Sequence, residues 1–597
     1  MRDPTVDKRR GGGGTVEHAH DTGYTLRRLW QYLRHFKLLI AVCAALMLGS
    51  NLLALAAPKI SGQAVNAMQG GVGKVDFGTV FRCVGLMLFC YVSSAILSFI
   101  LNRLMIYLSQ RTVRAIRQDL FDNLVDLPIA YFDTHTTGDT VSRISYDIDT
   151  IGASLSTDLL QIVNSVVTVV GCFVMMVSIS WQMSLLFCVA IPVTIKFAAY
   201  RNKRMRPLFA ARSAALGALN GYSEEMISGM RTVKAYHREQ TYIDKFQQFN
   251  KTAVDSYYEA DYYGTALGPA TNFISNVTLS FLGVLGALLY LWRVLALGDL
   301  SSFILYSRKF SGPINEAANI VSELQSALAA AERVFLVIDE PPEPADAPDA
   351  EVLNDVRGDV KIEDVQFGYS PEKIILRELD LVAPPGSLTA IVGPTGAGKT
   401  TIINLLMRFY DPQRGAIYVD GTEVRQVTRA SLRLSYAMVL QDTWLFTGTV
   451  YDNIAYGRPG ATRAQVEQAA KTARIHDFIT HLPQGYDTVL TEDGTNISKG
   501  QKQLLTIARA MLLDSAMLIL DEATSNVDTR TEMHIQAALR SLMQGRTCFV
   551  IAHRLSTIRG ADNILVIDGG RVREQGNHEQ LLAQGGLYAQ LYRAQFQ

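Results

Sequence analysis

Leu38 to Ala57 is an uninterrupted run of 20 residues without a charged side chain. A helix of this length spans the hydrocarbon core of a bilayer, which is about 30 Å thick. A signal peptide, suggested by the small residues before Pro58, is disfavoured because the run has full span length and more runs follow. The later runs cover roughly 84–101, 159–179, 183–199, 270–292 and 300–324. The sequence therefore predicts an all-α membrane domain of six spanning helices.

Basic residues are unevenly distributed between the connections that join these runs. The long connections are 102–158 and 200–269, and the short ones are 58–83, 180–182 and 293–299. The long connections are rich in arginine and the short ones carry few basic residues. Under the positive-inside rule, the long connections and both termini are cytoplasmic. We expect a multi-pass protein of the cytoplasmic (inner) membrane, with the lipid bilayer as its surroundings.

Composition changes along the chain predict its domains. Residues 1–23 are polar and glycine-rich, which is typical of a disordered tail. Residues 24–39 have one apolar face bordered by arginines, so they predict an interfacial helix that opens a transmembrane domain over 24–338. The proline-rich acidic stretch 339–356 predicts a linker, and alternating strands and helices predict an α/β domain over 357–597. The 56 basic and 56 acidic residues balance, so no nucleic-acid partner is expected.

Two adjacent cations, Arg308 and Lys309, interrupt the last apolar run about 12–14 Å from its start. A charge at the bilayer centre costs at least about 2.5–3.5 kcal/mol on insertion scales. We therefore expect both side chains to face a central cavity, where they could meet anionic or amphiphilic cargo. The alternative is that they pair with acidic groups or phospholipid phosphate. Asparagines in the spans are expected to hydrogen bond between helices. They are Asn51, Asn164, Asn272 and Asn276.

A glycine-rich loop lies between a predicted buried strand and a predicted helix. The loop comprises Gly393, Pro394, Thr395, Gly396, Ala397, Gly398, Lys399 and Thr400, and Thr401 follows it. Glycines allow positive φ angles, so backbone N–H groups can converge on phosphate oxygens beside the helix N-terminus. Lys399 is predicted to reach the β- and γ-phosphates and Thr400 a Mg²⁺ ion. This strand, loop and helix predict a P-loop site for ATP and Mg²⁺, to which Thr401 also contributes.

A second apolar strand, predicted over 517–520, ends in two carboxylates, Asp521 and Glu522. Asp521 is placed to hold Mg²⁺, in part through water. Glu522 is placed to orient and deprotonate the water that attacks the γ-phosphate. The alternative is that these carboxylates only cap the end of a strand. Together with the P-loop, they predict ATP hydrolysis.

From about residue 24 to 597 the chain resembles the ATP-binding-cassette (ABC) exporter family, because the remaining markers of that family follow in order. They are Tyr369, Gln441, the signature segment with Ser498, Gly500 and Gln501, the crossing loop 525–528, and His553. The resemblance implies that Tyr369 stacks on adenine, that Gln441 contacts Mg²⁺ and the membrane helices, and that His553 contacts the γ-phosphate. It also implies a dimer in which the signature segment binds the partner's nucleotide, and coupling helices near 132–139 and 223–229.

Some residues depart from the family pattern. Lys499 replaces the first glycine of the signature, and Asn526 replaces the usual alanine of the crossing loop. With Glu522 retained, these variants resemble one subunit of heterodimeric bacterial multidrug exporters. We therefore favour a heterodimer with a second half-transporter, although a homodimer remains the alternative.

The leading prediction is ATP-driven export of a hydrophobic or amphiphilic cargo, a drug or a lipid, by alternating access. An ATP-gated channel or regulatory membrane protein on the same scaffold is the alternative. Such a protein would need only ATP binding, and the presence of Glu522 argues against it. The sequence does not specify the cargo.

Overall fold

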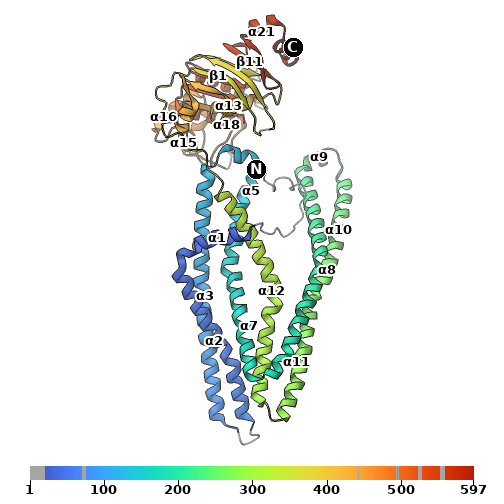
Figure 1. Ribbon diagram of the computed structural model, residues 1–597. Coiled ribbons are helices and arrows are strands. Elements are labelled where there is room, and N and C mark those ends of the chain that lie inside the picture. Colours follow the sequence, from blue (N-terminus) through green and yellow to red (C-terminus); the bar gives the residue numbers. More distant parts are fainter. Residues whose placement is uncertain are drawn as a thin grey trace. The chain divides into compact units, whose positions relative to one another are not determined.

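The computed structural model describes residues 21–69, 75–370, 372–441, 443–491, 494, 496–521, 528–551 and 558–596. The chain divides into two compact units. The helical unit contains 1–127 and 135–342, and the α/β unit contains 343–597 together with the short segment 128–134. Figure 1 labels several elements of each unit. The first 20 residues of the predicted tail lie outside the described residues.

The helical unit is built from long helices with a few short ones between them. They are α1 (Thr22–Leu33), α2 (Lys37–Met68), α3 (Phe77–Asp126), α5 (Thr137–Ser142), α6 (Ile148–Ala153), α7 (Leu159–Ile179), α8 (Trp181–Ser228), α9 (Met230–Ala235), α10 (Glu239–Thr265), α11 (Leu267–Leu291) and α12 (Leu297–Ile338). Within the described residues, five stretches are long and apolar enough to cross a membrane, namely 22–68, 77–126, 137–179, 181–228 and 239–291. The sixth predicted span falls in α12, which packs against α2, α7 and α11 (Figure 1). Its charged residues explain its lower hydropathy.

Helices α2 and α12 approach each other closely through a pair of glycines. A Cβ atom added to Gly298 would lie 1.9 Å from the Gly62 carbonyl oxygen, so the backbones meet where only glycine fits. The Gly298 N–H donates to Asn66 Oδ1 at 2.7 Å, and Ser302 Oγ donates to the Pro58 carbonyl at 2.8 Å. Small residues commonly allow membrane helices to pack this closely. We call this contact the α2–α12 seam.

Further along the seam, α12 compensates for a proline inside α2. Pro58 has no N–H, so the carbonyl of Ala54, four residues earlier, lacks its usual helical partner. Lys309 Nζ donates to that carbonyl at 2.9 Å, and Tyr306 Oη donates to the Leu55 carbonyl at 2.5 Å. Membrane helices tolerate an interior proline when neighbours satisfy the freed carbonyls. Lys309 therefore contacts the backbone of α2 instead of an acidic side chain.

Helix α1 is attached to the end of α12. Tyr24 and Arg28 both hydrogen bond to the carboxylate of Asp339, and the Tyr32 ring stacks on Phe335 with centroids 6.0 Å apart. The predicted interfacial helix thus also holds the segment that leads into the α/β unit.

One of the two predicted contact turns differs from its predicted position. Residues 223–228, predicted as a short contact helix, instead complete α8, which ends at its C-cap residue Gly229. The short helix that follows is α9. The glutamates and methionine of 223–228 favour a helix, so α8 continues until the glycine. The other predicted turn, 132–139, contains the end of α4 (Ile129–Thr134) and the start of α5.

The α/β unit contains strands β1 (Val360–Phe367), β2 (Leu376–Ala383), β3 (Leu388–Val392), β4 (Arg414–Val419), β5 (Thr422–Glu423), β6 (Tyr436–Val439), β7 (Gly448–Thr449), β8 (Val489–Leu490), β9 (Met517–Asp521), β10 (Thr547–Ile551), β11 (Asn563–Asp568) and β12 (Arg571–Gly576). Its helices are α4, α13 (Lys399–Leu406), α14 (Arg429–Leu434), α15 (Val450–Ala455), α16 (Arg463–Thr472), α17 (His476–Thr480), α18 (Lys499–Leu513), α19 (Thr529–Met543), α21 (His578–Gln584) and α22 (Leu587–Phe596).

The main sheet of this unit is buried on both faces. Among the described residues its six strands lie in the order β12-β11-β3-β10-β9-β6, and only β12 runs antiparallel to its neighbour. In β3, Ala390 and Val392 belong to one hydrophobic cluster, and Ile391 belongs to the cluster on the opposite face. Successive side chains of a strand point to opposite faces, so two cores need a continuous apolar run. This explains why β3 has no polar-apolar alternation.

Candidate functional site

The predicted nucleotide motifs follow the carboxyl ends of neighbouring parallel strands. Register pairs align Ile391 of β3 with Ile551 of β10, Ile551 with Asp521 of β9, and Leu520 of β9 with Val439 of β6. The four strand ends therefore meet at one edge of the sheet. In α/β sheets, ligands bind outside the carboxyl ends of the strands.

Each of these strand ends leads into a predicted site residue. Gly393 comes one residue after β3, and Gln441 comes two residues after β6. Asp521 is the last residue of β9. Glu522 and His553, which follow β9 and β10 in the chain, lie outside the described residues. The topology thus gathers the P-loop, Gln441 and Asp521 at one edge.

The glycines of the P-loop are required by its backbone. Gly396 and Gly398 have φ angles of +82° and +105°, which other residues rarely adopt. A Cβ atom on Gly393 would lie 2.1 Å from the carbonyl oxygen of Ile567 in β11. Helix α13 begins directly after Gly398, so its first N–H groups point towards the loop. This geometry can hold a phosphate anion.

In this structure the side chain of Lys399 hydrogen bonds to the backbone of its own loop. Its ammonium donates to the carbonyl oxygens of Gly393 and Pro394 at 2.8 and 3.0 Å. Burial lowers the pKa of Lys399, and the nearby Asp521 carboxylate partly opposes this effect. A partly buried cation whose contacts are backbone carbonyls can turn to a phosphate at little cost. The loop and its lysine are therefore suited to a polyphosphate.

The donor set beside the loop fits Mg²⁺. Thr400, Gln441 and Asp521 supply a hydroxyl, an amide and a carboxylate oxygen, and Mg²⁺ prefers a few protein oxygens together with waters and phosphates. Among the described residues, no group of three or more His, Cys, Asp or Glu side chains is arranged to hold a metal ion.

Tyr369 lies in an aromatic cluster beside α13. Its ring packs edge-on against Phe367 and Tyr410, with centroids 5.1 and 5.0 Å away. Asn404 Nδ2 donates to the Tyr369 hydroxyl at 2.9 Å, and that hydroxyl lies 3.4 Å from Thr401 Oγ1. Tyr369 remains 46% exposed, so its ring is held in place while accessible to a base. Buried Thr401 thus contacts Tyr369, a role that its sequence position did not indicate.

The same cluster contacts α4. Tyr410 donates from its hydroxyl to Asp133 Oδ2 at 2.5 Å. Asp133 lies in the segment predicted as a coupling helix, but sequence reasoning did not identify Tyr410 or Asn404. No local motif marks them, because they act through contacts 277 and 35 residues away along the chain. Tyr369, the predicted base-stacking residue, is therefore joined to α4 through one tyrosine, Tyr410.

The signature segment forms the start of α18. Ser498 Oγ accepts the Gln501 N–H, and Gln501 Oε1 accepts the Ser498 N–H at 2.8 Å, so the two residues form a capping box. Gly500 is buried and Lys499 is exposed. The helix N-terminus is thereby fixed, with the Lys499 side chain directed to solvent in this chain.

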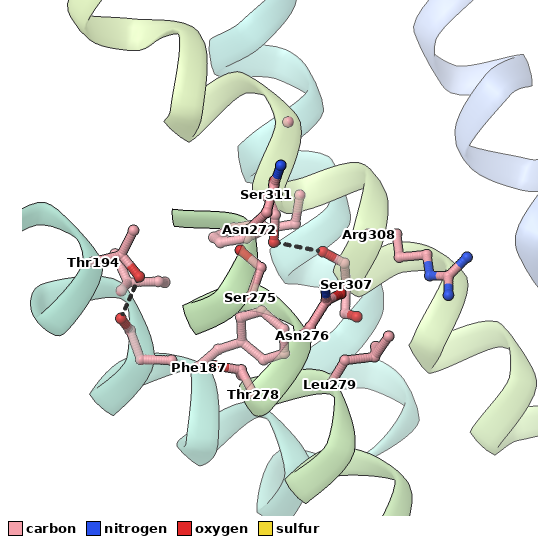
Figure 2. Close-up of a pocket in the computed structure, with 14 residues that line it drawn as sticks. Phe187, Thr194, Asn272, Ser275, Asn276, Thr278, Leu279, Ser307, Arg308 and Ser311 are labelled. Atoms are coloured by element: carbon pink, nitrogen blue, oxygen red, sulfur yellow. Dashed lines mark hydrogen bonds between the residues drawn. The ribbon is translucent and has the colours of Figure 1, made fainter. Parts of the chain in front are cut away.

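A cavity of about 330 Å³ lies in the helical unit between α8, α11 and α12 (Figure 2). Asn272 and Asn276 line it, which differs from the expectation that they bond between helices. For Asn51 the expectation is confirmed, because its Oδ1 accepts from Thr168 Oγ1 at 3.2 Å. Arg308 is among the residues that line this cavity, whereas Lys309 is not.

Known proteins match both units. The family described as "ABC transporter transmembrane region" matches residues 38–314, and the family described as "ABC transporter" matches 376–525. An uncharacterized ABC transporter ATP-binding protein of Bacillus subtilis is 41% identical over 592 residues, covering 99% of this chain and 97% of that protein. A fatty acid ABC transporter ATP-binding/permease protein of Mycobacterium bovis is 43% identical over 554 residues, covering 93% and 86%.

One further relative is a lipid flippase, and one similar protein has a solved structure. An ATP-dependent lipid A-core flippase of Sodalis glossinidius is 35% identical over 587 residues, covering 96% of this chain and 98% of that protein. The structure of a bacterial Atm1-family ABC exporter with ATP bound superposes with a TM-score of 0.72 at 31% identity, covering 94% and 98%.

Fold and nucleotide site together define a membrane transporter driven by ATP. The chain belongs to the ABC transporter family, as an exporter-type half-transporter with its transmembrane and ATP-binding domains on one polypeptide. The predicted fold class, a helical membrane domain fused to an α/β P-loop domain, is confirmed, as is an ATPase coupled to transport. Half-transporters of this family act as dimers in a membrane.

Proposed function

We propose that this half-transporter exports an amphiphilic, lipid-like cargo across the cytoplasmic membrane, with both termini in the cytoplasm. The observation that carries this proposal is a cavity with both aromatic and polar walls among the spanning helices of a chain that also holds a P-loop. The fatty acid transporter and the lipid A-core flippase among its relatives support a lipid-like cargo.

The site residues take distinct roles in this proposal. Tyr369 stacks on the adenine, and Lys399 leaves the loop carbonyls to bind the β- and γ-phosphates. Thr400, Gln441 and Asp521 hold Mg²⁺, which would neutralise charge on the transferred phosphate. Glu522 deprotonates the attacking water and His553 contacts the γ-phosphate. The remaining P-loop residues, together with Thr401, form the phosphate cradle, while Ser498, Gly500 and Gln501 bind the partner's nucleotide.

ATP acts in this scheme as the ligand that shifts populations between two conformations. Two nucleotide-binding domains that share ATP at their interface favour the closed dimer, and differential affinity is what allows a ligand to move such an equilibrium. The contact between Tyr410 and α4 offers a path from the base to the membrane helices. Hydrolysis removes the γ-phosphate and resets the inward-facing state.

We favour a heterodimer as the working assembly. Lys499, Asn526 and a retained Glu522 are the residues that support it. A lysine ammonium within about 4 Å of the partner's phosphates would contribute on the order of 1–4 kcal/mol, depending on the local dielectric. In this assembly the partner subunit lacks its own catalytic glutamate.

The function is tested in vesicles that contain the purified chain, alone or with a co-encoded second half-transporter. We expect ATP-dependent movement of a fluorescent lipid or drug from the outer face of inside-out vesicles, which corresponds to the cytoplasm, into the lumen. Movement without ATP hydrolysis would support the ATP-gated channel instead. Full cargo-stimulated turnover by the chain alone would establish a homodimer and remove the heterodimer proposal.

Replacing Tyr410 with phenylalanine is expected to weaken coupling while sparing ATP binding. The change removes only the hydroxyl that contacts Asp133, and the ring that packs on Tyr369 remains. Coupling free energies usually correspond to factors of 5 or more, so stimulation of ATPase activity by transported cargo should fall about fivefold. The measurement compares ATPase rates with and without cargo.

Tyr418→Phe is the matched control for this variant. Its hydroxyl makes no hydrogen bond to the part of the chain that the structure describes. It should therefore behave like the unmodified protein. Equal cargo stimulation in Tyr410→Phe and Tyr418→Phe would rule out a coupling role for the contact with α4.

A further inference from the structure

The cavity between α8, α11 and α12 combines an aromatic wall with a polar wall (Figure 2). Phe187 and Phe310 pack edge to face with centroids 5.7 Å apart and an interplanar angle of 81°. Ile191 and Leu279 extend this apolar surface. A volume of about 330 Å³ is at the lower end for small-molecule sites. It suits a small polar head with the first part of an apolar chain.

Most hydroxyl groups of the polar wall already have partners on their own helices. Thr194 donates to the Ala190 carbonyl at 3.0 Å, and Ser311 donates to the Ser307 carbonyl at 3.0 Å (Figure 2). These donors are occupied and contribute little to an incoming anion. Their oxygens can still accept a hydrogen bond from a protonated or hydroxylated head.

Two side-chain amides of the polar wall differ from these hydroxyl groups. Asn272 and Asn276 are four residues apart on α11, so both side chains lie on one face of the helix. Both are exposed, and their amides have no hydrogen-bond partner within the described ranges. Each amide offers two N–H donors to whatever occupies the cavity.

Arg308 supplies a positive charge to the cavity lining. Among the described residues that line the cavity, it is the single charged side chain, and no carboxylate is present. It is exposed and forms no ion pair with a described residue, and Figure 2 shows its side chain extending from α12 away from Thr194, Asn272 and Asn276. Lys309 cannot substitute for it, because its ammonium is bound to the Ala54 carbonyl. The cavity thus has two neutral donors in its lining and, at its edge, one positive charge on a long side chain that can turn towards them.

We propose that this cavity selects amphiphiles with a singly charged anionic head, a carboxylate or a phosphodiester, held by Arg308, Asn272 and Asn276. The guanidinium fork matches two oxygens of one acid group, and the amides complete its shell. A dianionic head would leave one charge without a counterion, and a cationic head would be repelled. This inference rests on the proposed function and specifies which cargo the same site takes.

The test measures binding to the purified transporter, with its partner subunit, in nucleotide-free nanodiscs. The probes share a 16-carbon tail and differ in the head: palmitate, lysophosphatidylglycerol, hexadecanol and hexadecylamine. We expect palmitate or lysophosphatidylglycerol to bind most tightly. Arg308→Gln should lower the affinity for that probe by about tenfold or more, because hydrogen bonds to charged groups are stronger than those between neutral groups. Hexadecanol affinity should not change. Which acid binds distinguishes a carboxylate from a phosphodiester cargo.

Two variants make the result specific. Arg308→Lys keeps the charge but loses the planar fork, so it should show an intermediate affinity. Arg293→Gln removes an exposed cation outside the cavity lining and should bind like the unmodified protein. The proposal is overturned if Arg308→Gln binds both acids normally, or if hexadecanol or hexadecylamine binds more tightly than either acid.

Failure of this inference is distinguishable from failure of the proposed function. ATP-driven movement of a neutral or cationic amphiphile, unchanged in Arg308→Gln, would overturn the selection by charge and leave lipid-like export standing. If no amphiphile moves in the ATP-driven vesicle assay, the proposed function itself fails, whatever the nanodiscs bind.

Discussion

Replacing Glu522 with glutamine should reduce ATP hydrolysis by at least about 100-fold while leaving ATP binding intact. A positioned general base contributes about 10²- to 10⁴-fold to a rate, and glutamine keeps the size of the side chain while removing its basicity. Lys399 and the P-loop, which hold the phosphates in our proposal, are unchanged in the variant. The closed ATP-bound dimer should therefore accumulate.

Two measurements check this result. Phosphate release gives the rate of hydrolysis, and retention of labelled ATP after gel filtration shows the trapped state. Glu579→Gln makes the same chemical change at an exposed position in the first turn of α21 and should turn over normally. Unchanged turnover in Glu522→Gln would show that Glu522 is not the general base. It would also remove the main argument against an ATP-gated channel.

Replacing Gly298 with alanine should destabilise the helical unit by about 3 kcal/mol or more, the upper part of the range for overpacked cores. The new Cβ would lie 1.9 Å from the Gly62 carbonyl oxygen and 2.6 Å from Asn66 Oδ1. A backbone atom cannot move aside as a flexible side chain can, so α2 and α12 would have to separate. Separation would also break the hydrogen bonds of the α2–α12 seam.

Thermal unfolding of the detergent-solubilised protein measures this loss. Gly283→Ala is the matched control, because it makes the same change in the middle of α11, where a new Cβ has no atom within 4 Å. It should unfold at an unchanged or slightly higher temperature, since alanine favours helix over glycine. If both variants unfold together, the α2–α12 seam contributes nothing to stability.

The parts that the sequence predicted well depend on local chemistry. The P-loop needs a strand, glycines at positive φ and a helix start, and all three lie within about 20 residues around Gly396 and Gly398. Asp521 at the end of β9 is equally local. Because parallel strands place their carboxyl ends at one edge, the gathering of Gln441 and Asp521 follows from the α/β pattern.

The parts that the sequence missed depend on contacts between distant segments. The sequence predicts that the first apolar run ends before Pro58, but α2 continues to Met68, and α12 satisfies the carbonyls around the proline. Nothing near Lys309 in the chain indicates that its partner is the Ala54 carbonyl. The contact between Tyr410 and Asp133 was missed for the same reason.

The hydrogen bonds from α12 to the carbonyls near Pro58 of α2 also limit how the two helices can move. Lys309 and Tyr306 bond to backbone atoms of α2, and backbone atoms cannot rotate away independently. Helices α2 and α12, the first and last predicted spans, should consequently move together as one rigid pair during transport. A force applied at the C-terminal end of α12 would then move both helices together, and Arg308 with them.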